Sequence, residues 1–383
     1  MGDLNGSRMQ LCFVFFAFVF TITLYYRIND GVNIRSCESS IASYDVLNKT
    51  INTSSGLIQC ETLLTLWNTE IPVLIVDVEF LNKLSNSDCH QNIGVDIEFK
   101  STQSLVDGRR FEVIYYSRNV SKDFMDFDID GRRIIPKRFE MRSIGNIRIP
   151  SDLKTFIGFW KRSKFVDCVG LKVARNESEE VTMPGQTSSD ILARLRDELI
   201  DNGMFPFLSS GTFLGWYREC SMIPHTWDMD LAISYDNYNP EYLKKLENGD
   251  TQFKILRRLG MVENSLEMTV IPKKEEDPRI DIFIMYDGIE NGTLTHSYIS
   301  GLDIDGTKYK WSNPIYDPWC SAELHGHIFW VSCTPKSKII FEFGDFWYLD
   351  KPTSTYSWNS ASKNVKAYGK FTEEEMKEVY IVY

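Results

Sequence analysis

The sequence predicts an α/β protein whose second half is a mixed sheet with helices, preceded by a small α/β domain, a stem and one transmembrane helix. Three observations lead to this prediction. One uninterrupted apolar run lies near the amino terminus, and short strand-like apolar segments follow it. From about residue 185 onward, such segments alternate with amphipathic helix patterns. With 383 residues, 43% of them hydrophobic, the chain is long enough for two domains.

The charge balance argues against one class of partner. The chain has 53 acidic and 42 basic residues, which gives a net charge of −11. Nucleic-acid backbones and anionic membrane surfaces attract proteins that carry an excess of Lys and Arg. We therefore expect no nucleic-acid partner.

The apolar run near the amino terminus predicts a membrane anchor over residues 10–27. It reads LCFVFFAFVFTITLYY and contains no charge between Arg8 and Arg27. A hydrocarbon core about 30 Å thick requires about 20 residues, and thinner early-secretory membranes require fewer. A cleaved signal peptide is the alternative, but the run is long for one and no small-residue cleavage site follows. The positive charge before the run favours a cytosolic tail over 1–9 and a luminal body.

Cysteines and glycosylation sequons agree with a luminal body. Seven of the eight cysteines follow the anchor, and none forms a CxxC pair that would suggest zinc. Disulfides are expected in an oxidising lumen. The preferred pair is Cys320–Cys333, because these two residues flank an expected hairpin. An odd number leaves at least one thiol without a partner in the same chain. Predicted N-glycosylation sites are Asn48, Asn52, Asn119, Asn176 and Asn291.

Two regions separate the anchor from the second domain. Residues 28–66 are rich in Ser, Asn and Thr and predict a stem. Residues 67–180 predict an N-terminal luminal domain, because a continuous apolar run in IPVLIVDVEF suits a buried strand and alternating segments such as FEVIYYS follow it. Its residues do not indicate any chemistry.

The second domain, over 185–383, opens with an amphipathic helix. The segment SSDILARLRDELIDNGMF has a Ser or Asp cap and ends at Gly203. A strand, a short helix and a second strand are expected at FPFLSS, TFLGWYRE and DMDLAIS. Further helices are expected at PEYLKKLE and TQFKILRRLG, strands at LEMTVIP and RIDIFIMY, and a final helix that Thr372 and Glu375 open as a capping box.

Three acids mark a candidate metal site. Side chains two apart in a strand share a face, so Asp228 and Asp230 point the same way with Cα atoms roughly 6.6 Å apart, while Met229 points into the core. Asp281 likewise lies on the face opposite to Ile280. If the two strands are neighbours, three carboxylates meet at one sheet edge, and such hard oxygen ligands suit Mg²⁺ or Mn²⁺. A single Asp-x-Asp at a strand start is also common as turn and cap chemistry, so the prediction depends on the combination.

The Gly-Thr turn before this strand supplies the expected phosphate contacts. Gly211 permits a tight turn, and a helix starting near Thr212 offers backbone N–H groups to a phosphate. Gly215 allows another group to approach the helix closely, and Arg218 is expected within reach of a phosphate oxygen. These four residues are the predicted substrate-binding set. Nearby Trp and Tyr side chains are expected to serve packing rather than a nucleobase.

The order of these features is typical of the nucleotidyltransferase fold. The segment SSGTFLGWYRECSMIPHTWDMDLAI resembles the fukutin branch of the fukutin/LicD family of phospho-alcohol transferases, which includes the bacterial LicD phosphocholine transferases. The likeness extends to VENSLEMTV, RIDIFIMY, WCSAEL, VSCTP, FGDFW, SASKNV, the anchor and, more loosely, VLIVDVEFLNKL. The chain departs from the family at His225, Thr226 and Trp227, which leaves the donor or acceptor open.

The resemblance implies a function and assigns the site. Such proteins are single-pass type II proteins of the Golgi apparatus or endoplasmic reticulum. They transfer ribitol 5-phosphate from CDP-ribitol, a CDP-alcohol donor, to a glycan of a glycoprotein such as dystroglycan and release CMP. Asp228 and Asp230 would be the metal-binding pair, Asp281 the third catalytic and metal-binding acid, and Gly211 and Thr212 would lie at the donor phosphates. Other glycosyltransferases are further expected partners.

Two alternatives stay open at the level of the sequence. The same fold can transfer phosphocholine or glycerol phosphate. The other alternative is a protein without catalytic activity, which binds glycans in the Golgi or acts as a scaffold for other transferases. It stays open because a fold does not fix a function.

Overall fold

The computed structural model describes most of the second half of the chain and parts of the first. The described residues are 73–77, 103–106, 109–116, 121–129, 132–144, 147–175, 181–274, 278–315 and 319–383. The predicted anchor over 10–27 and stem over 28–66 lie outside them. Within the described residues, no helix combines the length and apolarity needed to cross a bilayer. Contacts divide the described chain into two compact units, one up to residue 114 together with 141–154, the other 115–140 together with 155–383.

The structure describes five strands that lie mainly in the first unit. Its three-stranded sheet has the order β1-β3-β2, and a separate hairpin pairs β6 with β7. The strands expected at IPVLIVDV and FEVIYYS are present as β1 and β3. The bounds are β1 Val73–Asp77, β2 Gln103–Val106, β3 Arg109–Tyr116, β6 Met141–Ile144 and β7 Ile147–Pro150.

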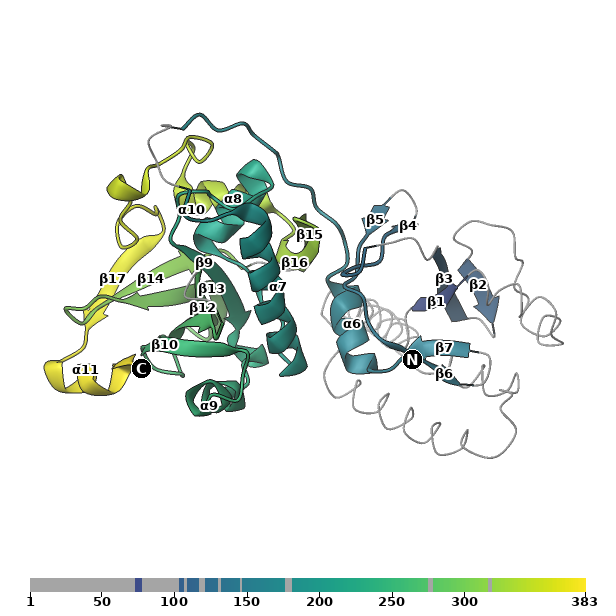
Figure 1. Cartoon of the computed structure of the whole chain (residues 1–383), viewed down its shortest axis with the longest axis horizontal. Coiled ribbons are helices and arrows are strands. Elements are labelled where there is room, and N and C mark those ends of the chain that lie inside the picture. The colour runs from purple at the N-terminus through teal and green to yellow at the C-terminus, as the bar shows by residue number, and fades with distance from the viewer. Residues whose placement is uncertain are drawn as a thin grey trace, which may run out of the picture. The chain divides into compact units, whose positions relative to one another are not determined.

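A mixed sheet forms the second unit (Figure 1). Its strand order among the described residues is β15-β16-β8-β9-β12-β11-β10-β18, and β13, β14 and β17 continue from β12. The strands are β8 Phe207–Leu208, β9 Asp228–Ser234, β10 Phe253–Leu259, β11 Glu267–Pro272, β12 Arg279–Glu290, β13 Thr293–Leu302, β14 Thr307–Asn313, β15 Trp319–Leu324, β16 His327–Ser332, β17 Val365–Lys370 and β18 Tyr380–Val382. A small hairpin of β4 Phe127–Ile129 and β5 Arg132–Ile134 lies apart from this sheet. The predicted mixed α/β architecture is confirmed.

Helices cover this sheet, and α7 runs across it in Figure 1. The helices are α6 Leu153–Lys161, α7 Gly185–Asp201, α8 Ser210–Glu219, α9 Pro240–Asn248, α10 Pro335–Phe343 and α11 Glu373–Val379, with short 3₁₀ helices η1 Tyr235–Asn237 and η2 Thr353–Thr355. The expected helix at SSDILARLRDELIDNGMF is α7, which begins earlier than predicted, after Pro184. The predicted capping box of the last helix is present, since Thr372 and Glu375 bond each other's backbone N–H groups.

One expected helix is wrong. TQFKILRRLG contains strand β10, which pairs with β11 on one side and β18 on the other. The spacing of Phe253, Leu256 and Leu259 by three residues imitates a helix face. In the structure, a register shift between Ile255 and Arg257 marks a β-bulge, and Phe253 and Leu259 pack in different core clusters. Pairing with two neighbouring strands overrides the local pattern.

The central strands bury one face completely. Met229, Leu231 and Ile280 are fully buried, and their strand neighbours Ile282 and Ile284 are buried with them. They form one core cluster with apolar residues of α7, α8 and α9. The predicted inward side of DMDLAIS is therefore confirmed, and the acids lie on the other side of the same strands.

A buried ion pair ties the segment before β4 to this unit. Arg196 of α7 is fully buried, and its Nη2 lies 2.7 Å from Asp123 Oδ1. The other carboxylate oxygen of Asp123 accepts from the backbone N–H of Ile328 at 2.6 Å. Burial opposes ionisation of Asp123, but contacts with His327 and Arg196 outweigh it and hold the pKa of Asp123 well below its usual range.

We predict that Asp123→Asn lowers the free energy of unfolding by about 3 kcal/mol at pH 7, because it leaves the buried charge of Arg196 poorly compensated. The depressed pKa makes this contribution present above the unfolded-state pKa near 4 and lost as the pH falls through the folded-state pKa. Urea unfolding at pH 7 and at pH 3 measures both. The matched control is Asp126→Asn, whose partner Arg133 is half exposed, and a loss below about 1 kcal/mol is expected there. Equal losses in the two variants would refute the role of Asp123.

Candidate functional site

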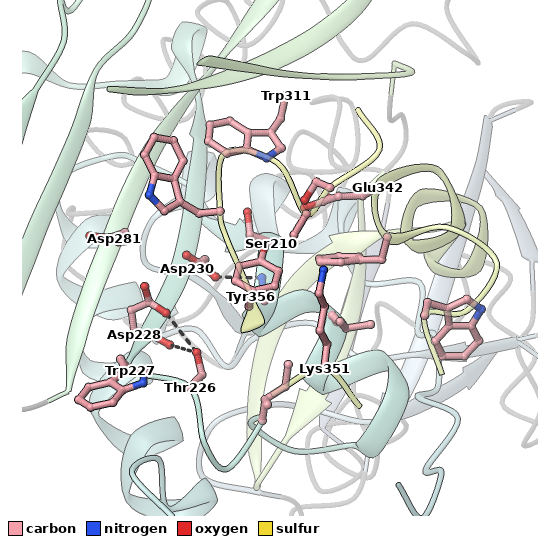
Figure 2. Close-up of a pocket in the computed structure, with 18 of the residues that line it drawn as sticks. Ser210, Thr226, Trp227, Asp228, Asp230, Asp281, Trp311, Glu342, Lys351 and Tyr356 are labelled. Carbon is pink, nitrogen blue, oxygen red and sulfur yellow. Dashed lines mark hydrogen bonds between the residues drawn. The ribbon is translucent and has the colours of Figure 1, made fainter. Parts of the chain in front are cut away.

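The parallel pairing of β9 with β12 brings the three predicted acids together. The register sets Asp230 beside Asp281 and Asp228 beside Arg279. One carboxylate oxygen from each of Asp228, Asp230 and Asp281 lies within 4.8 Å of the other two. Figure 2 shows the three side chains on one side of a cavity. The condition that the sequence left open, that the two strands are neighbours, is met.

The Gly-Thr turn contacts the acid pair directly. The backbone N–H of Gly211 donates to Asp230 Oδ2 at 3.0 Å, and that of Thr212 lies 3.4 Å from the same oxygen. The Thr212 hydroxyl in turn accepts from the backbone N–H of Asp230 at 2.7 Å. The two amides at the start of α8 therefore orient a carboxylate. The sequence had instead predicted a phosphate as their partner.

Gly215 and Arg218 also contact groups of the chain itself. A Cβ at Gly215 would come within 2.8 Å of the Ser221 carbonyl oxygen, so the close approach predicted there is made by the following turn. Arg218 is 2% exposed, and its Nη1 donates to the carbonyl of Leu349 at 2.9 Å. It also bonds the neighbouring Glu219 side chain. Arg218 thus borders the cavity while it holds the loop after α10 in place.

Two strands that sequence reasoning did not connect to the site complete it. Thr269 of β11 pairs with both Arg257 of β10 and Asp281 of β12. Its hydroxyl donates to Asp281, and Arg257 Nε donates to Thr269 at 2.6 Å. Arg257 Nη2 also lies 3.1 Å from Glu267 and 3.6 Å from Asp281. Sequence reasoning missed Arg257 because it assigned TQFKILRRLG to a helix. A strand at this segment would have placed Arg257 at the same sheet edge as the acids.

The site carries more negative charge than its own residues neutralise. Burial raises the pKa of Asp281 to about 6 and that of Glu267 to about 8, although Arg257 opposes both shifts. Burial, followed by the charges of Asp228 and Asp281, raises the pKa of Asp230 well above its usual value. Burial also raises the pKa of Asp228. Buried carboxylates at this density favour a bound cation as the compensating charge.

The acids open onto a cavity of about 400 Å³. Much of the remaining wall is aromatic and comes from segments far apart in the sequence. Trp227 is 67% exposed here, whereas Trp216 and Tyr217 are buried in the core, as expected of packing residues. Other residues that line the cavity are Trp311, Glu342, Phe346, Lys351, Tyr356 and Trp358.

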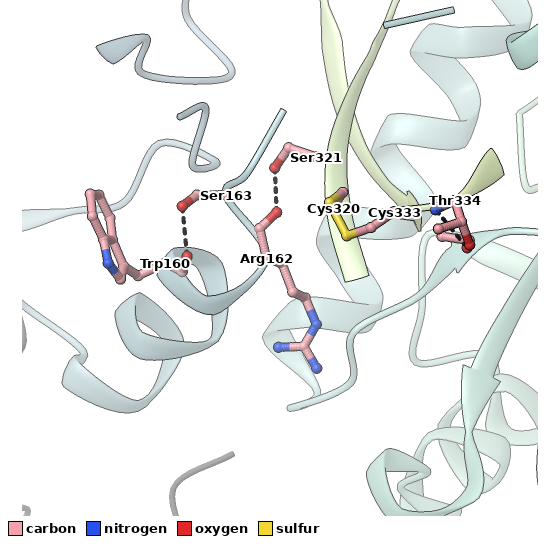
Figure 3. Close-up of a disulfide and its surroundings, with 8 residues drawn as sticks. Trp160, Arg162, Ser163, Cys320, Ser321, Cys333 and Thr334 are labelled. Carbon is pink, nitrogen blue, oxygen red and sulfur yellow. Dashed lines mark hydrogen bonds between the residues drawn. A yellow bond between two sulfur atoms is a disulfide. The ribbon is translucent and has the colours of Figure 1, made fainter. Parts of the chain in front are cut away.

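Disulfides cross-link segments of the second unit. Cys320 and Cys333 are bonded, as the sequence suggested, and join β15 to the residue after β16 (Figure 3). A second disulfide, Cys168–Cys220, fixes the end of α8, and no sequence signal singled out this pair. The cysteines at 37, 60 and 89 lie outside the described residues.

Of the predicted sequons, Asn291 is described. It lies exposed at the turn between β12 and β13. The sites at Asn48, Asn52, Asn119 and Asn176 lie outside the described residues.

We predict that the protein in a chelator is less stable to urea at pH 8 than at pH 5.5. The folded-state pKa of Asp281, about 6, and of Glu267, about 8, exceed the ordinary values near 4. The folded state therefore holds protons that the unfolded chain has released, and stability falls as the pH rises between about 4 and about 8. Asp228→Asn removes one like charge and should show a shallower decline.

The exposed Asp236, two residues after β9, supplies the control. Asp236→Asn should follow the unmodified protein. A contact with Asp123 raises the pKa of His327, and this contributes a decline of the same sign in all three proteins. The difference between Asp228→Asn and Asp236→Asn is therefore the quantity to compare, and identical slopes would contradict the charge cluster.

Two family models match the chain. Residues 59–167 match the model described as W02B3.4-like, N-terminal domain. Residues 203–334 match the model described as LicD/FKTN/FKRP, nucleotidyltransferase domain, and this range contains the Gly-Thr turn and all three acids.

Curated relatives agree with both matches. The Caenorhabditis elegans protein W02B3.4 is 49% identical over 330 residues, which cover 85% of each chain. A second protein of that organism, T07A5.1, is 37% identical over 333 residues, covering 85% of this chain and 88% of its own. Both are named as uncharacterized. The mouse protein named ribitol-5-phosphate transferase FKTN is 29% identical over 244 residues, or 61% of this chain and 50% of its own.

These comparisons limit how far the resemblance to fukutin extends. The likeness to FKTN covers half of that protein, whereas the two nematode proteins match along most of their length. The likeness to FKTN extends over 244 residues, and the domain match at residues 203–334 contains the acid cluster. The chain therefore belongs to the family of the nematode protein W02B3.4, and its residues 203–334 match the nucleotidyltransferase domain of LicD, FKTN and FKRP.

Proposed function

We propose that this protein transfers a phospho-alcohol from a CDP-alcohol to a sugar hydroxyl of a glycoprotein glycan and releases CMP. The observation that carries the proposal is the cluster of three carboxylates from two parallel strands, within 4.8 Å of one another, at the wall of a cavity. The match of residues 203–334 to the nucleotidyltransferase domain of LicD, FKTN and FKRP supports it. CDP-ribitol is the first donor to test, because the relative FKTN is named a ribitol-5-phosphate transferase.

The residues of the cluster fit Mg²⁺ or Mn²⁺. Asp228, Asp230 and Asp281 would hold the ion with hard carboxylate oxygens, which both metals prefer. When bound, such an ion neutralises charge on the transferring and leaving phosphate oxygens. Hydrogen bonds within the protein orient two of these ligands. Thr226 donates to Asp228 Oδ1 at 3.2 Å, and the backbone N–H of Gly211 at the start of α8 donates to Asp230.

Asp281 is the acid that we propose to receive the proton of the attacking hydroxyl. A general base must lie within hydrogen-bond reach of that hydroxyl and keep a fixed orientation. Thr269 donates to one carboxylate oxygen of Asp281, and Arg257 lies 3.6 Å from the other. These two residues therefore act as positioning residues for Asp281.

We propose a Golgi or endoplasmic-reticulum lumen as the compartment. The disulfides Cys168–Cys220 and Cys320–Cys333 support an oxidising environment. A membrane anchor over 10–27 and association with other glycosyltransferases stay predictions from the sequence.

We predict that Asp228→Ala and Asp230→Ala each lower transfer at least about 1,000-fold while the thermal unfolding midpoint stays within a few degrees. Loss of charge stabilisation at a transferring phosphoryl group has effects of this size. The assay incubates the full chain with Mn²⁺, a glycan acceptor and, in turn, CDP-ribitol, CDP-glycerol and CDP-choline, and weighs the product.

Asp236→Asn is the matched control for this assay and should retain full activity, because its side chain is exposed after the end of β9. Transfer from CDP-glycerol or CDP-choline alone would keep the reaction class and change the alcohol. Unchanged transfer in both alanine variants would refute the site. A protein that binds none of the donors and transfers nothing would support the glycan-binding or scaffolding alternative.

A separate prediction concerns Asp281. Thr269→Val should lower kcat about 10-fold and leave the KM for the CDP-alcohol within twofold, because the lost hydrogen bond orients the base rather than the donor. Steady-state kinetics with varied donor measures both constants. Thr295→Val, on the exposed part of β13, serves as the control. A rise in donor KM with unchanged kcat would mean that Thr269 contributes to binding instead.

A further inference from the structure

One side of the cavity has no role in the proposed transfer chemistry. Glu342 of α10 and Trp311 of β14 line it, together with Trp358 from the loop after α10. Figure 2 shows Glu342 and Trp311 across the cavity from Asp228. The three residues come from separate elements, so the fold has assembled them at this wall.

Glu342 is a buried carboxylate with few protein partners. It is 3% exposed, yet it borders the cavity. Within the described residues, the hydrogen bond found for its carboxylate comes from Lys338, at a long 3.5 Å. Lys338 lies one helical turn earlier, so this single contact uses little of the acceptor capacity of Glu342. An ionised carboxylate has about four acceptor positions, and those facing the cavity are available to hydroxyl donors.

Trp311 and Trp358 form an aromatic wall beside it. Their ring centroids are 5.7 Å apart, and Tyr309 packs edge-on against Trp358 at 5.2 Å. Both indoles lie against Gly301 of β13, where a Cβ would come within 2.9 Å of Trp311 and 3.2 Å of Trp358. A residue without a side chain at position 301 is what allows the two rings to pack on the strand. Trp358 nevertheless stays 39% exposed, which leaves ring surface for a ligand.

The charge of this wall selects the kind of group that fits. Asp228, Asp230, Asp281 and Glu267 already line the same cavity, so a further carboxylate repels a phosphate. A carboxylate next to aromatic faces suits a molecule with hydroxyl donors on its edge and C–H groups on its face, as in an alditol or a sugar. A cytosine amino group could also donate to Glu342. However, Glu342 lies close enough to Asp230 for its charge to contribute to the raised pKa of that acid. In a CDP-alcohol, the alcohol is bonded directly to a phosphate, whereas ribose separates the base from the phosphates. A position near the acid cluster therefore favours the alcohol over the base.

We propose that Glu342, Trp311 and Trp358 form a subsite for a polyhydroxylated group, which is either the alcohol of the donor or the sugar of the acceptor. The proposal rests on the proposed function and adds to it the part of the substrate that this wall recognises.

Calorimetric titration of the full chain with CDP-ribitol and with CDP, both with Mn²⁺, tests the subsite in Glu342→Gln and Trp358→Ala. If the wall binds the donor alcohol, both variants bind CDP-ribitol at least tenfold more weakly and CDP within twofold of the unmodified protein. If it binds the acceptor sugar, both affinities stay unchanged and the KM for the glycan acceptor rises at least tenfold.

Two outcomes would overturn the proposal. Equal weakening of CDP and CDP-ribitol would mean that the wall holds the cytosine base. No change in either affinity or in the acceptor KM would mean that it binds no part of the substrates. Trp358→Ala keeps the test valid if Glu342→Gln unfolds through the loss of a counter-charge for Lys338.

A control and a nucleotide-free arm separate this proposal from the proposed function. Phe341→Ala changes the same helix at an exposed residue outside the cavity and should leave all three quantities within twofold. If the unmodified protein binds neither nucleotide, the proposed function fails. Saturation-transfer NMR with free ribitol, xylose and galactose then tests the subsite alone: a signal that Trp358→Ala abolishes supports it, and no signal in the unmodified protein overturns it.

Discussion

The register between β9 and β12 is the constraint on which the site depends. It places Asp230 beside Asp281, and a slip of either strand by one residue would turn the carboxylates of that strand toward the core. The opposite faces of the two strands prevent that slip, because they bury a continuous set of Met, Leu and Ile side chains, each worth about 1.5–3 kcal/mol. Apolar packing on one face therefore holds like charges together on the other.

The surrounding residues orient these charges and neutralise only part of them. The Gly211 and Thr212 amides hold Asp230, Thr226 holds Asp228, and Thr269 holds Asp281. Arg257 is shared between Glu267 and Asp281. Neutral donors fix geometry while leaving negative charge for a cation, which is the arrangement that a metal-assisted phosphoryl transfer requires.

The loop after α10 lines the cavity and contacts His225, one of the positions where the sequence departs from the fukutin pattern. His225 Nε2 lies 3.1 Å from Asp350, and Arg175 and Arg218 approach the same carboxylate. The next two residues also border the cavity, since Thr226 bonds Asp228 and Trp227 is exposed. These three residues therefore line the cavity, which is the place where we propose that the donor and the acceptor bind.

The sequence alone determined the features that are encoded within single segments. Alternation in DMDLAIS and RIDIFIMY assigned the faces of the three acids, and cap residues identified the last helix. Only the tertiary structure decided what depends on pairing between distant segments: that TQFKILRRLG forms a strand, that Arg257 and Thr269 reach Asp281, that Cys168 bonds Cys220, and that the Gly-Thr amides face Asp230. The physical reason is that local periodicity specifies which face of a segment is apolar, whereas the neighbour across that face is chosen by long-range packing.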